Sequence, residues 1–114
     1  MIFSSNYNYK ERENMFNKSL EWYLKSGNLG YVKAQLKLGY LYSHKLQDKE
    51  SFEWYLTAAK QENAEAQYKV GDCYEYGEGV KKNKKEAIYW YKKAAAQGHE
   101  KAKFQLNLLT APWF

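Results

Sequence analysis

The chain has 114 residues, and its 18 basic and 13 acidic side chains give a net charge of +5. This length allows one domain at most. A single cysteine, Cys73, excludes an internal disulfide and fits a reducing compartment. No run approaches the roughly twenty apolar residues of a membrane span, and residues 1–15 show no secretory signal. We therefore expect a cytoplasmic protein without membrane contact.

The positive charge does not favour a nucleic-acid partner. Arg12 is the only arginine, although arginine is the residue that bidentate base and phosphate recognition prefers. The one dense lysine run, residues 81–85, lies between two helical patterns, where a solvated loop is expected. We expect no nucleic-acid partner, and a weak nucleic-acid binder stays as an alternative.

A Trp-Tyr pair occurs three times, and an alanine follows each tryptophan by twelve residues. The tryptophans are Trp22, Trp54 and Trp90, and the alanines are Ala34, Ala66 and Ala102. Both landmarks are spaced by 32 residues and then by 36 (22 to 54 to 90; 34 to 66 to 102). Such an internal repeat predicts an array of units, each packed on its neighbours. The recurring tryptophans are therefore expected to be packing residues.

The apolar spacing within the units is helical. Ala34, Leu38 and Tyr42 step by four, as do their counterparts one unit later, which is typical of one buried helix face. Glycines at 77, 79 and 98 interrupt the pattern where helices should end, because glycine accepts the left-handed backbone of a helix cap. In chain order the predicted helices cover residues 11–26, 31–43, 48–61, 64–76, 84–97 and 99–109.

Two stretches carry a family resemblance. Ala66-x-x-x-Val70-Gly71-x-x-Tyr74-x-x-Gly77-x-Gly79-Val80 and Ala87-x-x-Trp90-Tyr91-x-Lys93-Ala94-Ala95-x-Gln97-Gly98-His99 resemble the consensus of the Sel-one-like repeat, a relative of the tetratricopeptide repeat. The match is close over residues 66–99 and decays over 16–65 and 100–109. In the first full unit, Lys60-Gln61-Glu62-Asn63 stands near the position of the family's usual Gln-Gly.

The resemblance implies an all-α, right-handed α/α superhelix, a solenoid of helix-turn-helix repeats forming one domain over residues 1–114. About two full units are expected, over 28–63 and 64–98, with partial units over 1–27 and 99–114. Residues 1–9 would be the remnant of a further helix. Pro112 should stop the last helix, and Trp113-Phe114 would either cap the array or dock into a second copy, which leaves monomer and homodimer open.

The resemblance also implies a concave groove lined by the helices that begin near Ala34, Ala66 and Ala102. The predicted partner-binding residues are Leu36, Tyr40, His44, Tyr68, Asp72, Glu75, Tyr76, Phe104 and Leu108, with Lys33, Ser43, Glu65 and Lys101 at the margins. An apolar strip rimmed by charge suits a protein partner. For Leu36, Tyr68 and Phe104, packing between repeats stays an equal alternative.

The residues give little support for catalysis. His44 and His99 lie far apart in the repeat pattern, and Cys73 is expected to be a small core residue. Zinc would need about four suitably spaced ligands, and the Gly77-Glu78-Gly79 turn lacks the strand and the Lys-Ser/Thr of a phosphate loop. We expect no enzyme activity, no metal and no cofactor.

The function that we expect is non-enzymatic binding of one partner protein in the groove. Since the chain has little beyond its repeats, an inhibitor that neutralises a cognate toxin or enzyme, as immunity proteins do, is the sharper hypothesis. An adaptor or scaffold of a larger complex is an alternative. A hydrolase of the type associated with cysteine-rich family members is another, although this chain lacks their paired cysteines.

Overall fold

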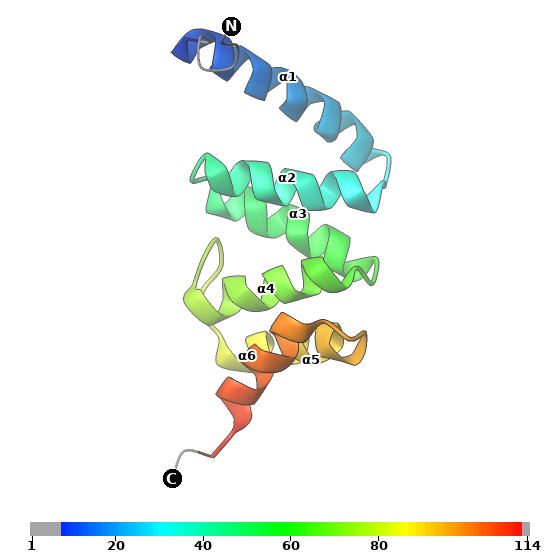
Figure 1. Ribbon diagram of the computed structural model, residues 1–114, viewed down its shortest axis with the longest axis vertical. Coiled ribbons are helices and arrows are strands. Elements are labelled where there is room, and N and C mark those ends of the chain that lie inside the picture. Colours follow the sequence, from blue (N-terminus) through cyan, green and yellow to red (C-terminus); the bar gives the residue numbers. More distant parts are fainter. Residues whose placement is uncertain (1–7, 113–114) are drawn as a thin grey trace, which may run out of the picture.

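The computed structural model describes residues 8–112, and this part of the chain forms six helices and no strand. The helices are α1 (Tyr9–Asn28), α2 (Val32–His44), α3 (Asp48–Lys60), α4 (Ala64–Tyr76), α5 (Lys84–Ala96) and α6 (Glu100–Thr110). Each packs mainly on the next, so the helices stack into an array of 56 × 33 × 27 Å (Figure 1). The radius of gyration is 16.4 Å, against about 13 Å for a compact domain of this length. The predicted array is confirmed.

The predicted helices lie where the periodicity placed them, and only α1 is notably longer. Asn8 begins it with a capping box: its Oδ1 accepts from the Glu11 amide at 2.8 Å, and its own amide donates to Glu11 Oε1 at 3.1 Å. Asn8 and Tyr9 therefore belong to α1 and not to a separate remnant helix. The rest of that predicted remnant, residues 1–7, lies outside the described residues, as do Trp113 and Phe114. Pro112 follows the end of α6, as expected.

A tyrosine ring on a bare glycine holds each helix pair together. A Cβ at Gly39 of α2 would lie 2.5 Å from the ring of Tyr55 in α3, and one at Gly71 of α4 would lie 2.6 Å from the ring of Tyr91 in α5. Heavy atoms cannot approach that closely, so a side chain on either glycine would force the helices apart. The glycines thus let α2 meet α3, and α4 meet α5, at the distance of backbone against ring.

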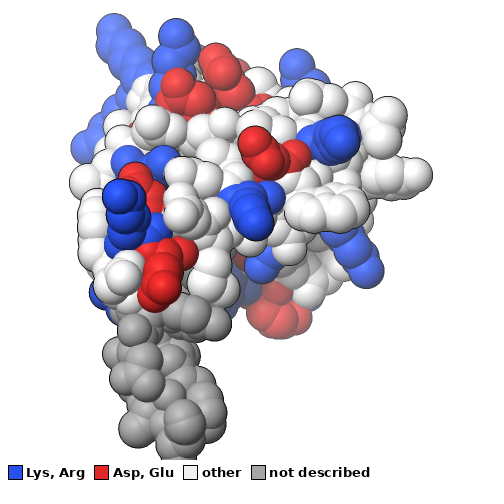
Figure 2. Space-filling model, turned by 90° about the horizontal axis from the view of Figure 1, so that it is seen from above, with Lys and Arg blue, Asp and Glu red and all other residues white. Residues whose placement is uncertain are grey.

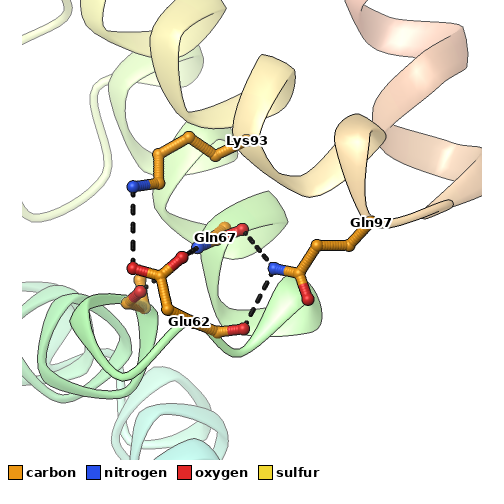
Figure 3. Close-up of polar contacts among 5 residues, drawn as sticks. Glu62, Gln67, Lys93 and Gln97 are labelled. Atoms are coloured by element: carbon orange, nitrogen blue, oxygen red, sulfur yellow. Dashed lines mark hydrogen bonds and ion pairs between the residues drawn. The ribbon is translucent and has the colours of Figure 1, made fainter.

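Glutamine side chains join successive units at their turns. The Gln97 amide donates to the Glu62 carbonyl and to Gln67 Oε1, both at 3.0 Å, and Gln67 donates to the Ala59 carbonyl at 3.3 Å (Figure 3). The bonds from Gln97 thus tie the end of α5 to the turn between α3 and α4 and to α4 itself. Lys93 adds an ion pair to Glu62 at 3.7 Å.

The same arrangement recurs one unit earlier. Gln61 donates to the Gly30 carbonyl at 3.1 Å and to Gln35 Oε1 at 2.7 Å, and Gln35 donates to the Gly27 carbonyl at 3.0 Å. Gln61 therefore makes hydrogen bonds equivalent to those of Gln97, although the sequence around it has diverged. Glu62 likewise takes the place of Gly98: both have left-handed backbones, with φ of 66° and 91°.

The three tryptophans differ in burial. Trp90 is buried and Trp54 is half-buried, but Trp22 is 72% exposed. The prediction that all three are packing residues is wrong for Trp22. The ring of Trp54 lies against Gly27 of α1, within 3.2 Å of where a Cβ would stand. A tryptophan at this position thus needs an earlier helix to rest on, and no helix precedes α1 within residues 8–112.

No helix in the described range combines the length and the apolar character needed to cross a membrane.

Substituting Gly71→Ala should lower the free energy of unfolding by about 2 kcal/mol, because overpacking against Tyr91 outweighs the gain in helix propensity. Urea denaturation would measure this. The matched control is Asn107→Ala, at the equivalent position of α6, where the side chain is exposed. The control should be neutral or slightly stabilising; equal behaviour of the two variants would contradict the close-approach argument.

Substituting Glu62→Gly should raise the free energy of unfolding by about 1 kcal/mol, because glycine adopts the left-handed backbone without the Cβ clash. The exposed ion pair to Lys93 subtracts little from this gain. Gly98→Ala, at the equivalent turn, should destabilise by a similar amount. Thermal denaturation of both variants checks the prediction, and destabilisation by Glu62→Gly would show that its side-chain contacts outweigh the backbone strain.

Candidate functional site

The predicted partner-binding residues lie on α2, α4 and α6, and we call the surface that they form the groove. Equivalent positions differ in chemistry from helix to helix: Leu36, Tyr68 and Phe104 share one position, Tyr40, Asp72 and Leu108 another, and His44 and Tyr76 a third. Phe104 is 63% and Tyr76 is 56% exposed, and Tyr40 and Leu108 are also exposed. The groove therefore offers aromatic and aliphatic side chains to solvent.

Packing between repeats was left open for Leu36, Tyr68 and Phe104, and two of these three residues do pack inward. Leu36 is half-buried and packs against the core cluster that contains Phe52 and Val70. Tyr68 is half-buried beside Tyr91, with ring centroids 5.9 Å apart. Phe104, by contrast, is not a core residue.

The carboxylates of Asp72 and Glu75 contact α5 as well as the groove. The Tyr91 hydroxyl lies 2.5 Å from Asp72 Oδ1 and 2.6 Å from Glu75 Oε1, so one phenol faces two carboxylates. Burial raises the pKa of Asp72, while the hydrogen bond from Tyr91 opposes that rise. Burial and the two carboxylates raise the pKa of Tyr91, which keeps the phenol a donor. Glu75 also accepts from Gln105 of α6 at 3.1 Å.

The two histidines and the cysteine are not brought together. His99 caps α6: its Nδ1 accepts from the Ala102 amide at 3.1 Å, which leaves Nε2 to donate to Glu65 at 2.7 Å. His44 instead lies edge-on to Tyr40, with ring centroids 4.4 Å apart. Cys73 is buried in the core, as expected, and burial raises its pKa to about 12, which keeps the thiol unreactive.

The groove contains a hollow between α2 and α4 with a volume of 420 Å³, which we call the α2–α4 hollow. It is lined by Lys33, Leu36, Lys37, Tyr40, Tyr55, Glu65 and Lys69. Lys37, Tyr55 and Lys69 were not among the residues predicted from the sequence. A comparison of units could have singled out Tyr55, because its counterpart Tyr91 faces Asp72 and Glu75, whereas the residues equivalent to these two carboxylates are Tyr40 and Ser43.

Charge is mixed on the end of the molecule that carries α1. Figure 2 shows lysine and arginine side chains intermingled with aspartate and glutamate on this face. Binding to a phosphate backbone relies on basic side chains gathered on one face. This end of the molecule therefore carries no patch of the kind that favours nucleic acid.

Tyr91→Phe should destabilise the protein by an amount that depends on pH. The pKa of Asp72 is higher in the folded state than in the unfolded chain, so the folded state binds the proton more tightly. The stability that this proton contributes is complete below the ordinary pKa of about 3.9, and it is lost as the pH rises through the folded pKa. Removing the phenol raises that pKa further. Urea denaturation should therefore show a small difference from the wild type at pH 4 that grows to about 2 kcal/mol at pH 7.

The control for this pH series is Tyr55→Phe, whose hydroxyl donates to no carboxylate among residues 8–112. Its difference from the wild type should be the same at every pH. A pH-independent difference for Tyr91→Phe would refute the coupling between Tyr91 and Asp72.

Comparison with known proteins supports the repeat register. The family model described as Sel1 repeat matches residues 12–31, 32–63 and 64–99, which together make up most of the chain. No curated protein gives a significant match. Proteins of this family generally mediate protein–protein interactions, and the fold is typically a non-enzymatic scaffold.

Two solved structures show the same solenoid. A Sel1 repeat protein from Oxalobacter formigenes is 40% identical with a TM-score of 0.74, and the match covers 77% of this chain and 69% of that protein. A protective antigen of uropathogenic Escherichia coli strains, which displays an SLR fold, is 35% identical with a TM-score of 0.74 over 79% of this chain. The match spans 20% of the antigen's length. On the family match, the helix-pair architecture and these likenesses, the chain belongs to the Sel1 repeat family.

Proposed function

We propose that the chain binds one partner protein in the groove formed by α2, α4 and α6, without catalysing a reaction on it. The observation that carries the proposal is a contrast between two sets of repeat positions. Positions that pack keep their chemistry: a buried alanine lies in the first turn of α2, α4 and α6, and a glycine meets a tyrosine ring in both full units. Positions that face the groove change from unit to unit and include side chains that stay exposed.

The exposed groove residues suit recognition of a protein surface. Phe104 and Leu108 of α6 are exposed one turn apart, and Tyr76 and Tyr40 add aromatic area with a hydroxyl group. Large side chains of this kind supply most of the binding energy at protein interfaces, and nearby charges set the register. Glu65, Glu75 and the lysines of the α2–α4 hollow provide such charges.

Inhibition of that partner is the sharper form of the proposal, and an adaptor role is the alternative. An inhibitor needs one partner in the groove and abolishes its activity at equal stoichiometry. An adaptor instead leaves its partner active and holds a second protein at the same time. Once a partner is isolated, its activity in the complex and the composition of the complex separate the two forms.

A photoreactive phenylalanine analogue placed at Tyr76 or Phe104 should cross-link to a discrete partner in an extract of the source cells. The matched control is Tyr89 on α5, which is 52% exposed and lies outside the groove. The partner is then purified and its affinity measured. Tyr40→Ala/Tyr76→Ala/Phe104→Ala should weaken binding by about a hundredfold, because exposed aromatic anchors dominate such interfaces.

Tyr89→Ala should leave the affinity unchanged. The groove proposal is contradicted if the analogue cross-links at Tyr89 and at no groove position. It is also contradicted if the triple variant folds and binds the partner with full affinity.

A further inference from the structure

The α2–α4 hollow is lined by more basic than acidic side chains. Lys33, Lys37 and Lys69 line it, and none of the three forms an ion pair with a carboxylate within residues 8–112. Glu65 is the one acidic residue among the lining side chains, and His99, the N-cap of α6, donates to it at 2.7 Å. The hollow therefore favours a negatively charged occupant.

Tyr55 lines the same hollow and carries a hydrogen-bond donor. Its side chain is only 6% exposed, yet its hydroxyl has no hydrogen-bond partner among residues 8–112. No polar side-chain atom sealed from solvent lacks a partner in this range, so the hydroxyl is open to solvent. Burial raises the pKa of Tyr55, and the phenol therefore keeps its proton at neutral pH.

The neighbouring unit shows what such a phenol binds. Tyr91 packs on Gly71 as Tyr55 packs on Gly39, and its hydroxyl is occupied by the side-chain carboxylates of Asp72 and Glu75. The positions equivalent to these two carboxylates in α2 are Tyr40 and Ser43, and the Ser43 hydroxyl donates to the Tyr40 carbonyl at 2.7 Å. The first unit thus keeps the donor and lacks the two carboxylates.

The surroundings of Tyr55 also fix the side from which an anion arrives. Tyr55 and Lys69 also border a second, smaller hollow of 130 Å³, which three acidic residues line, at Asp48, Asp72 and Glu78. Carboxylates outnumber the one lysine there, whereas three lysines and one glutamate line the α2–α4 hollow. Like charges repel an anion there, whereas the lysines of the α2–α4 hollow attract one. Leu36 and Tyr40 flank the lysines and offer apolar area beside the charge.

We propose that the α2–α4 hollow binds the side-chain carboxylate of an aspartate or glutamate from an acidic segment of the partner, with Tyr55 donating a hydrogen bond to it and Lys37 and Lys69 supplying the charge. The inference rests on the proposed function, because the carboxylate belongs to the partner protein that binds in the groove. A side chain fits better than a chain terminus, because the internal carboxylates at Tyr91 are side chains and the groove continues onto α6.

The test uses small blocked amino acids and needs no identified partner. N-acetylglutamate α-amide is titrated into the full chain at pH 7 and followed by NMR at Tyr55, Lys37 and Lys69, with N-acetylglutamine α-amide as the uncharged counterpart. The glutamate probe should give saturable shifts at these residues, and the glutamine probe should give none. N-acetylglutamine with a free α-carboxylate tests the chain terminus as the source.

Two matched variants locate the donor. Tyr55→Phe keeps the ring on Gly39 and removes only the hydroxyl, so it should bind the glutamate probe about tenfold more weakly. Tyr91→Phe removes the equivalent hydroxyl one unit later and should leave the affinity unchanged. Lys37→Gln/Lys69→Gln should abolish measurable binding.

Three outcomes would overturn the proposal: no saturable shift with the glutamate probe, equal affinity of Tyr55→Phe and the wild type, or tighter binding of the free α-carboxylate than of the side chain. If cross-linking in the groove succeeds while the glutamate probe fails to bind, the groove function stands and the carboxylate proposal falls. If the probe binds but groove positions capture no partner, the groove function falls instead.

Discussion

The contact between a glycine of one helix and a tyrosine ring of the next sets the geometry of both full units. At Gly39 and Gly71 the backbone is bare, so the partner ring lies where a Cβ would otherwise stand. This contact fixes the separation of the two helices and buries the ring. It also positions each phenol, because a ring packed against the glycine carries its hydroxyl to a fixed place beside that helix. The groove chemistry therefore depends on a packing constraint.

The two units use that constraint differently. In the second unit the Tyr91 hydroxyl is hydrogen-bonded to the carboxylates of Asp72 and Glu75, and this contact ties α5 to α4. At Tyr55 the same packing leaves a protonated phenol without an acceptor among residues 8–112, beside three lysines that form no ion pair in that range. A hydrogen-bond donor without an acceptor and a charge without an ion-pair partner both favour ligand binding. One unit of a repeated fold can therefore differ in its chemistry from the next.

Recognition of the repeat predicted the helices and their order, but burial at individual sites depended on neighbours. Trp22, Trp54 and Trp90 are identical in the pattern, yet Trp22 is exposed because a tryptophan at that position packs on an earlier helix. Gln61 looked like part of a decayed turn and still makes the bonds that Gln97 makes. Side-chain roles of this kind depend on distances between units, which periodicity does not specify.

The sequence by itself determined the class of fold, the boundaries of the helices within a few residues and the family, because helical period and repeat spacing are local properties. It also predicted that α2, α4 and α6 line a groove. Only the tertiary structure decided that Asp72 and Glu75 face Tyr91, that Phe104 is exposed while Leu36 and Tyr68 pack inward, and that Tyr55, Lys37 and Lys69 share a hollow. The reason is physical: burial and charge balance arise between side chains that are distant in sequence, and helix packing alone sets which of them meet.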